Sequence, residues 1–561
     1  MKHFYILSGI LIAVSAYTKQ IPFLNAQTSE RKFPDARSFL NHVNKVFSDS
    51  EFEINQASWN YNTNITEHNQ KVSTDIEIKA NEVLLKIIEE AKQYEGETED
   101  EKRQLLLISL KSGTPSSRED QRRLSELQAK MTEIYSTAKV DGHTLEPDLT
   151  ETLATSRDYD TLLKAYIGFR DATGPKIKPM YEEFIKLMNV GAKENNFDDA
   201  GALWRAGYDM GDLDFVTMME KVWQQVLPLY EQIHCYTKYK LSEKYEKVDE
   251  NKEFIPAHLL GNMWSQDFSN IYSDILIPFP DVTPVEITPE LVKQKLLSAW
   301  DFGNNDLRIK MCTAVTGEEL LTIHHEQGHL YYDHYYSNQP SLYRESAADF
   351  FHEAIGDTMV LSVVVPEHLQ EIGLLKGKLE KSLKQTINAQ MAVALSKIAV
   401  LPWAYMVDLY RWKLFAGVVT KENYQSEWEN LMKKYQGIER PIPGVSTDFD
   451  AGAKYHVPAN TPYVRYFGAA VIQFQFHESL CKVAGHTGPL HECSIYKNLE
   501  AGNNFKNLLS LGRSKTWQEA VNIGTNGQYD TLDGQSLIKY FAPLMDWLKE
   551  ENKGKTCGWG D

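Results

Sequence analysis

Cysteine is scarce in this 561-residue chain, and basic residues are in the minority. Five cysteines exclude a disulfide-dense scaffold and leave one thiol over after any pairing. Lys and Arg total 59 against 77 Asp and Glu, and the net charge of -18 argues against nucleic acid or an anionic membrane as the main partner. The chain also has no internal repeat, low-complexity tract or Pro/Gly/Ser linker. With 42% hydrophobic residues it can bury a large core, which predicts one large domain.

The first residues have the pattern of a secretory signal peptide. Lys2 precedes an apolar run over residues 4–12, and the small residues Ser15 and Ala16 follow. An N-terminal anchor is the alternative, but the run is well short of the roughly 20 apolar residues that a span needs. We expect a signal peptide over residues 1–16, or 1–26, and a single mature domain over 27–561. We find no later stretch apolar enough for a bilayer and predict a secreted protein without a membrane anchor.

Secretion gives meaning to two further patterns. Asn64-Ile65-Thr66 is a glycosylation sequon, with Asn64 as the acceptor. Cys481 and Cys493, in CKVAGHTGPLHEC, form the natural disulfide pair, and closing this short loop would contribute about 3 kcal/mol. The sequence assigns no role to Cys235 or Cys557.

Apolar residues recur with helical spacing over long stretches, whereas strand signals are short and few. Residues 76–88 and 124–134 each place their apolar side chains on one helix face. These patterns predict a mainly α fold, with a small β element near the active centre.

The strongest chemical signal is the segment HHEQGH. His325-Glu326-Gln327-Gly328-His329 matches the pattern H-E-x-x-H. On a helix His325 and His329 fall one turn apart on one face, so both imidazoles can bind one Zn2+ while Glu326 lies beside the metal. Two surface histidines on a polar helix remain the alternative.

A second segment, FHEAIGD, lowers the weight of that alternative. A zinc hydrolase needs a third ligand and an open fourth position, and Glu353 can supply the ligand from a neighbouring helix. Asp357, one turn further on, can hold a ligating imidazole by its second nitrogen. Because three ligands complete the set, the other nearby histidines are expected either to be structural or to support the ligands without binding the metal: His324, His334 and His352.

At these residues the chain resembles the angiotensin-converting enzyme family of zinc dipeptidyl carboxypeptidases. The resemblance runs through SWNYNTNITE, LEPDLTETLATSRDYD, PAHLLGNMWSQ, DLRIKMCT, HHEQGH, FHEAIGD, AKYHVPANTPYVRYF and QFQFHESLC. It implies a large helical ellipsoid with a deep central cleft, one zinc ion per domain at the floor of that cleft, and removal of C-terminal dipeptides from oligopeptides.

The resemblance also assigns roles to single residues. The family's zinc ligands match His325, His329 and Glu353, and its general base matches Glu326. Two residues match the donors to the oxyanion of the transition state: His456 and Tyr466. Three match the clamp on the substrate's C-terminal carboxylate: Gln266, Lys454 and Tyr463. Without the resemblance, Lys454 would be interpreted as a surface charge and the tyrosines as core.

Chloride is the family's activator, at two anion sites. Tyr208 and Arg465 match the site near the catalytic tyrosine. Arg170 and Trp428 match the other site, but Met432 stands where the family has a second arginine, which removes one of its cations.

The chain departs from the family between Asp281 and Ser298. Only a short segment stands where the family has several dozen more residues, including an edge that binds substrate and the cysteine that pairs with the one matching Cys312. Leu296 and Leu297 occupy the positions of the family's substrate-binding histidine and alanine. Because backbone pairing to an edge strand holds a peptide in register, this loss bears on substrate positioning but not on the metal.

Two functional hypotheses follow from the sequence. The first is a secreted zinc metallopeptidase that removes C-terminal dipeptides from oligopeptides. The second is a zinc-binding but catalytically impaired member that binds peptides or a protein partner, since the shortened segment carries part of the substrate site. The intact ligands and base favour the first. The sequence makes no prediction of oligomeric state.

Overall fold

The computed structural model describes residues 32–64, 66–111, 113–282, 299–302, 306–309, 317–375 and 382–560. Several sequence predictions fall outside these ranges. They are the signal peptide, Ile65 of the sequon, Leu296 and Leu297 of the shortened segment, and Cys312.

The predicted mainly α fold is confirmed. The apolar stretches at 76–88 and 124–134 lie within α2 and α4. The helices are α1 (Ala36–Thr63), α2 (Glu67–Ala91), α3 (Glu99–Leu110), α4 (Arg118–Thr137), α5 (Thr150–Thr155), α6 (Tyr159–Glu194), α7 (Ala200–Ala206), α8 (Asp212–Lys244), α9 (Gly317–Tyr336), α10 (Asp349–Val363), α11 (Pro366–Glu371), α12 (Leu383–Lys397), α13 (Val400–Phe415), α14 (Tyr424–Leu431), α15 (Val464–Val483), α16 (Leu499–Leu509), α17 (Trp517–Gly524), α18 (Gln535–Tyr540) and α19 (Ala542–Glu551).

Strands in the described ranges are two or three residues long and form three separate pairs. They are β2 (Lys139–Val140) with β3 (His143–Thr144), antiparallel; β4 (Ile255–Pro256) with β7 (Ile438–Glu439), parallel; and β5 (Ala299–Asp301) with β6 (Leu307–Ile309), antiparallel. Both β5 and β6 pack against α9, the helix that carries HHEQGH. The small β element predicted near the active centre therefore lies where it was expected.

Local sequence signals explain where several helices begin. Asp35, Thr98 and Asp158 each accept a hydrogen bond from a backbone N–H in the first turn of α1, α3 and α6. In α3 the cap is reciprocal, because Glu101 also accepts from the backbone N–H of Thr98 at 3.1 Å. The residue before helix α15, Tyr463, does not cap the helix with its side chain.

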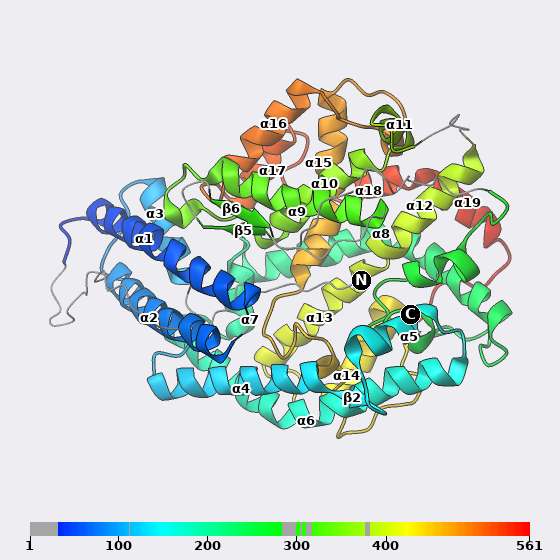
Figure 1. Cartoon of the computed structure of the whole chain (residues 1–561), viewed down its shortest axis with the longest axis horizontal. Coiled ribbons are helices and arrows are strands. Elements are labelled where there is room, and N and C mark those ends of the chain that lie inside the picture. The colour runs from blue at the N-terminus through cyan, green and yellow to red at the C-terminus, as the bar shows by residue number, and fades with distance from the viewer. Residues whose placement is uncertain are drawn as a thin grey trace.

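Most buried apolar side chains of the described ranges belong to two clusters. The larger one runs from α4 to α19 and includes the aromatic residues of α8, α13 and α15. The smaller one joins α1, α2 and α3 and is closed by Leu342. Figure 1 shows α1 and α2 side by side at one edge of the molecule, in blue, and α9, α10 and α15 together further in. Helices α1 to α3 thus have a core of their own beside the one that supports the candidate site.

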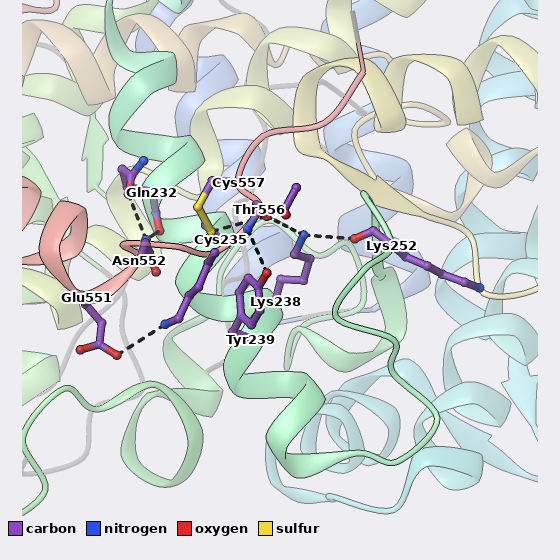
Figure 2. The surroundings of a disulfide bond; sticks show 10 residues. Gln232, Cys235, Lys238, Tyr239, Lys252, Glu551, Asn552, Thr556 and Cys557 are labelled. Atoms are coloured by element: carbon purple, nitrogen blue, oxygen red, sulfur yellow. Dashed lines mark hydrogen bonds and ion pairs between the residues drawn. A yellow bond between two sulfur atoms is a disulfide. The ribbon is translucent and has the colours of Figure 1, made fainter.

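Two disulfides are present in the described residues. Cys481–Cys493 confirms the sequence prediction. Cys235–Cys557 was not predicted and joins α8 to the C-terminal segment across 322 residues (Figure 2). Lys238 reinforces this junction, because its Nζ donates to the carbonyl oxygens of Thr556 at 3.0 Å and of Lys252 at 3.1 Å. Trp559 packs on His234 and donates from Nε1 to the carbonyl oxygen of Lys434 at 3.0 Å.

One helical stretch in the described ranges, residues 383–415, could cross a membrane by length and composition, with a mean hydropathy of 1.4 over its most apolar window. The prediction that no stretch after the N-terminal apolar run is long and apolar enough to cross a bilayer was therefore wrong. The stretch consists of α12 and α13, and 67% of that window is buried inside the protein. Core helices pass the same test, since burial in protein selects the same side chains as burial in lipid.

Candidate metal centre

Helix α9 presents the two histidines of HHEQGH as the sequence predicts. The Nε2 atoms of His325 and His329 lie 3.2 Å apart. Two nitrogens bound to one zinc at 2.0–2.1 Å with a tetrahedral angle would lie about 3.3–3.4 Å apart. Glu326 is half-buried on the same helix, and its charge acts on His325. The paired imidazoles therefore already have the spacing that a tetrahedral metal requires.

Helix α10 brings the third predicted ligand to this pair. Oε2 of Glu353 lies 3.7 Å from Nε2 of His325, and the ligand atoms of all three residues lie within 4.8 Å of one another. Two glycines make this approach possible. A β-carbon on Gly356 would lie 2.6 Å from Cα of His325, and one on Gly328 would lie 2.6 Å from the backbone nitrogen of Gly356. Only glycine at both positions lets the backbones of α9 and α10 cross this closely.

Asp357 holds the first histidine from its far side. Its Oδ1 lies 3.0 Å from Nδ1 of His325, so it can fix the tautomer that leaves Nε2 free for a metal. Its other oxygen, Oδ2, accepts from Nζ of Lys397 on α12. Sequence reasoning found Asp357 but missed Lys397, because nothing in the spacing of α12 relates it to α10.

The electrostatics of the cluster suit a cation. Burial opposes charge on the His325 imidazole, but the hydrogen bond to Asp357 and the negative charges of Asp357, Glu353 and Glu326 together outweigh it and raise the pKa of His325 to about 9. Burial and the neighbouring His325 hold the pKa of His329 well below its usual value. Burial also works against the Asp357 carboxylate, yet Lys397 and His325 keep its pKa well below the usual range. The positive charge of this histidine pair thus lies on His325, between the carboxylates of Asp357 and Glu353, and a divalent metal at Nε2 would replace the second proton of that ring.

The remaining histidines of the region contact other groups of the protein. Nδ1 of His352 lies 3.3 Å from Nδ1 of His329, so it orients the second ligand as Asp357 orients the first. Nδ1 of His324 lies 2.8 Å from the carbonyl oxygen of Leu320 in its own helix. The ring of His334 packs on Tyr335.

The segment AKYHVPANTPYVRYF places three aromatic rings beside this cluster. The ring of Tyr463 lies 4.7 Å from the rings of both His456 and Tyr466. After burial, the charge of Glu353 is the strongest influence that raises the pKa of Tyr466. Burial, with Lys454 second, lowers the pKa of His456 well below its usual value, so this ring is neutral at pH 7. Its Nδ1 is buried without a hydrogen-bond partner among the described residues. A neutral imidazole carries its proton on one of its two nitrogens, so His456 can donate a single hydrogen bond to a bound molecule.

The three residues predicted to clamp a carboxylate also come together. Oη of Tyr463 donates to Oε1 of Gln266 at 2.8 Å. Nζ of Lys454 lies 3.7 Å from the centre of the Trp264 ring and 5.2 Å from that of Tyr463. Lys454 is only 5% exposed, so its interpretation as a surface charge is wrong. Burial alone lowers its pKa to about 7.

The two predicted anion sites differ in their surroundings. Oη of Tyr208 and Nε of Arg465 are both buried without a hydrogen-bond partner among the described residues, and the charge of Arg465 acts on Tyr208. Such a pair of free donors suits an anion, although Arg465 also pairs with Asp349 at 3.0 Å. At the other site Nε of Arg170 is also buried without a hydrogen-bond partner among the described residues and lies 3.5 Å from Oδ2 of Asp450, an oxygen that accepts from Arg440 at 2.9 Å. Trp428 packs on Trp403 and Tyr410.

Asn64, the predicted glycosylation site, is exposed at the C-terminal end of α1. An oligosaccharide attached there would point into solvent.

Comparisons with known proteins agree with the site. The model of the protein family described as angiotensin-converting enzyme, peptidase family M2, matches residues 30–297 and 297–559. The angiotensin-converting enzyme of Oryctolagus cuniculus is 38% identical over 580 residues, covering 94% of this chain and 44% of that protein. That of Theromyzon tessulatum is 37% identical and covers 94% of this chain and 93% of that protein. The angiotensin-converting enzyme-like protein Ace3 of Mus musculus is 36% identical over 99% of this chain and 82% of that protein.

The chain spans about half the length of the mammalian angiotensin-converting enzymes that it matches. The match to the family breaks at residue 297, inside the shortened segment that the sequence revealed.

Proposed function

The chain belongs to the angiotensin-converting enzyme family of zinc-dependent metallopeptidases, and on that premise we propose that it removes C-terminal dipeptides from oligopeptides. The observation that carries the proposal is the convergence of His325, His329 and Glu353, with Glu326 on the same helix as the two histidines. A degenerate enzyme commonly loses a ligand or the base, and this chain keeps all four.

The donor set fits zinc. Two imidazole nitrogens and one carboxylate oxygen, each within reach of one point, form a three-ligand site that leaves a fourth position for water or substrate. When bound, zinc lowers the pKa of water towards neutrality and polarises a carbonyl group. Asp357 and His352 keep the two ligating rings in place from behind.

Proton transfer falls to Glu326. Its carboxylate accepts the proton of the attacking water and delivers it to the nitrogen of the leaving dipeptide. His456 and Tyr466 donate hydrogen bonds to the oxygen on which negative charge develops, and each donor can lower the barrier by several kcal/mol. A neutral His456 suits this role. It can donate a hydrogen bond to the oxygen of the transition state without a positive charge, and a positive charge would also stabilise the bound substrate before the reaction.

The distance between clamp and metal sets the cleavage position. Gln266, Lys454 and Tyr463 bind the free C-terminal carboxylate of the substrate, with one cation and two polar groups. A peptide anchored there presents a fixed peptide bond to Glu326, and removal of a dipeptide follows from that register. The partners are therefore oligopeptides with a free C-terminus.

Three further properties belong to the same proposal. The chain is secreted after removal of residues 1–16 or 1–26. It is glycosylated at Asn64, which is exposed. Chloride activates it through Tyr208 and Arg465, whose buried Oη and Nε atoms have no hydrogen-bond partner among the described residues. The site of Arg170 and Trp428 lacks the family's second arginine, because Met432 stands at that position.

A second candidate function rests on the break of the family match at residue 297. If the shortened segment no longer supplies an edge for the substrate backbone, the chain binds zinc and a peptide or protein partner without hydrolysis.

One experiment separates the two. The secreted chain is loaded with zinc, its metal content is measured, and a blocked tripeptide with a free C-terminus is offered together with its C-terminal amide. We expect release of the dipeptide from the free acid and none from Glu326→Gln, which keeps the size of the side chain. One zinc per chain, measurable peptide binding and no release by the wild type would reject the peptidase and establish the binder.

A further inference from the structure

We propose that Asp408 and Arg411 on α13 are positioning residues that hold the whole segment carrying Lys454, His456 and Tyr466 against the metal centre. Neither residue belongs to the ligands, the base, the oxyanion donors or the clamp. What the held residues do rests on the proposed function, but the contacts that hold them are present in the structure independently of it.

Arg411 binds the segment at two backbone carbonyls. Its Nη1 donates to the carbonyl oxygen of His456 at 2.9 Å, and its Nη2 donates to that of Thr461 at 2.7 Å. The carbonyl oxygen of His456 also accepts from the backbone N–H of Thr461 at 2.9 Å, which closes the turn between them. The guanidinium fork thus fixes both ends of this turn from one side.

Asp408 binds the same segment where it enters α15. Its Oδ2 accepts from the backbone N–H groups of Tyr463 at 2.6 Å and Val464 at 2.8 Å. The first residue before α15 has no capping side chain of its own, so Asp408 supplies from a neighbouring helix the acceptor that the first N–H groups need. Its negative charge also faces the positive end of the α15 dipole.

The two residues complete each other. Nε of Arg411 donates to Oδ1 of Asp408 at 2.9 Å, Nη2 donates to the same oxygen, and both side chains are fully buried. One carboxylate oxygen therefore serves the arginine and the other serves the backbone of α15. The pair connects four backbone groups between residues 456 and 464 to a single turn of α13.

This arrangement fixes position more than it adds stability. A buried ion pair is often no more stabilising than apolar side chains of the same volume, because both charges lose their hydration. Fixing the backbone at His456 and Tyr463, by contrast, sets where their rings and that of Tyr466 lie relative to α9 and α10. A displacement of about 1 Å in such groups is enough to cost a rate factor of about 100.

Three variants separate position from folding. Asp408→Asn leaves one oxygen to serve either Arg411 or the two N–H groups, but not both. A single substitution can prevent folding, because it leaves one charge buried without its partner. The double variant Asp408→Asn/Arg411→Gln avoids this, because it removes both charges. Arg411→Lys keeps a charge for Asp408 and lacks the fork. Asp274→Asn is the matched control, since Asp274 pairs with Arg157 at 2.6 and 2.9 Å and makes no contact with residues 454–466 among the hydrogen bonds of the described chain.

Each variant of the full chain is measured for zinc content, for kcat and KM on the blocked tripeptide, and for backbone hydrogen exchange over residues 454–466. We expect zinc content to stay at the wild-type level, kcat to fall about 100-fold in the double variant, and exchange at Tyr463 and Val464 to accelerate at least tenfold. Arg411→Lys should fall between the wild type and the double variant, and Asp274→Asn should match the wild type.

The proposal is overturned if the double variant folds with unchanged exchange at Tyr463 and Val464, or if exchange accelerates while kcat and KM both stay within twofold of the wild type. A wild type that does not hydrolyse the peptide refutes the proposed function instead. In that case the affinity for the peptide with a free C-terminus decides the question: it should weaken at least tenfold in the double variant, and equal affinity would overturn the positioning role.

Discussion

The buried lysine of the clamp leads to a quantitative prediction about pH. Lys454 is 5% exposed and lies over Trp264, and burial alone lowers its pKa to about 7. The free protein near pH 7 thus contains both charged and neutral Lys454. Only the charged form can pair with a substrate carboxylate, and that pairing must in turn raise the pKa of Lys454 in the complex.

The size of the effect follows directly. Below pH 6 nearly all molecules carry the charge and KM should be flat, whereas above pH 7 the competent fraction falls tenfold per pH unit, so KM should rise by up to about tenfold per unit. Binding a peptide at pH 7 should take up a fraction of a proton per site, and this fraction should grow as the pH rises towards 8. The assays are KM on the blocked tripeptide from pH 6 to 9, and calorimetry of an uncleaved peptide in two buffers of different ionisation enthalpy.

Two variants give the controls. Arg remains charged throughout this range, so Lys454→Arg should remove the rise of KM with pH even if its larger head raises KM overall. Lys454→Gln should raise KM at every pH and flatten the profile. A wild-type KM that stays constant from pH 6 to 9, with no proton uptake at pH 7, would refute the reasoning, as would the same rise in Lys454→Arg.

Three other predictions concern metal, acid and thiols. Gly356→Ala should place a methyl group against the backbone of His325, cost about 1–3 kcal/mol of stability and lower the zinc content. Thermal unfolding and metal analysis measure the two effects. Gly502→Ala is the control, because Gly502 has open space around it, and this variant should keep the stability and the zinc content of the wild type. Burial raises the pKa of Glu345, but Lys111 and Arg513 overcome this and lower it to about 2, so the ionised carboxylate stabilises the fold above pH 4.5 and this stabilisation is lost as the pH falls towards 2. The Tm should therefore fall less steeply between pH 4.5 and 2 in Glu345→Gln than in the wild type. Equal slopes in the two proteins would contradict this prediction. The unfolded, unreduced chain should react with a thiol reagent once, through Cys312, and Cys557→Ser should react twice; no reaction in the wild type would contradict this count.

Much of the site could be predicted because helices convert spacing into position. A separation of four residues fixes the approach of His325 and His329, and the same rule relates Glu353 to Asp357. The short loop between Cys481 and Cys493 likewise keeps its ends close, whatever the rest of the fold does. In each case the sequence alone limits the distance between the side chains.

Contacts between distant segments could not be predicted in this way. Nothing in the sequence brings Lys397 to Asp357, Arg411 to the carbonyl of His456, or Cys235 to Cys557, since each depends on how whole helices pack. The burial of Lys454 could not be predicted for the same reason. A charged residue is usually exposed, and the ring of Trp264 that lies against Lys454 is far away in sequence. The apolar stretch at 383–415 shows the converse, because composition does not distinguish a core helix from a membrane helix.

The bond between Cys235 and Cys557 has a consequence for handling the protein. Every proposed ligand, the base, the clamp residues and the break in the family match at residue 297 lie between these two cysteines. A protease that cuts the backbone once anywhere in this interval leaves two polypeptides that are still joined covalently. Such a nicked preparation would migrate as one intact chain on a gel without reductant and separate into fragments only after reduction, so both gels are needed before a loss of activity is attributed to a substitution.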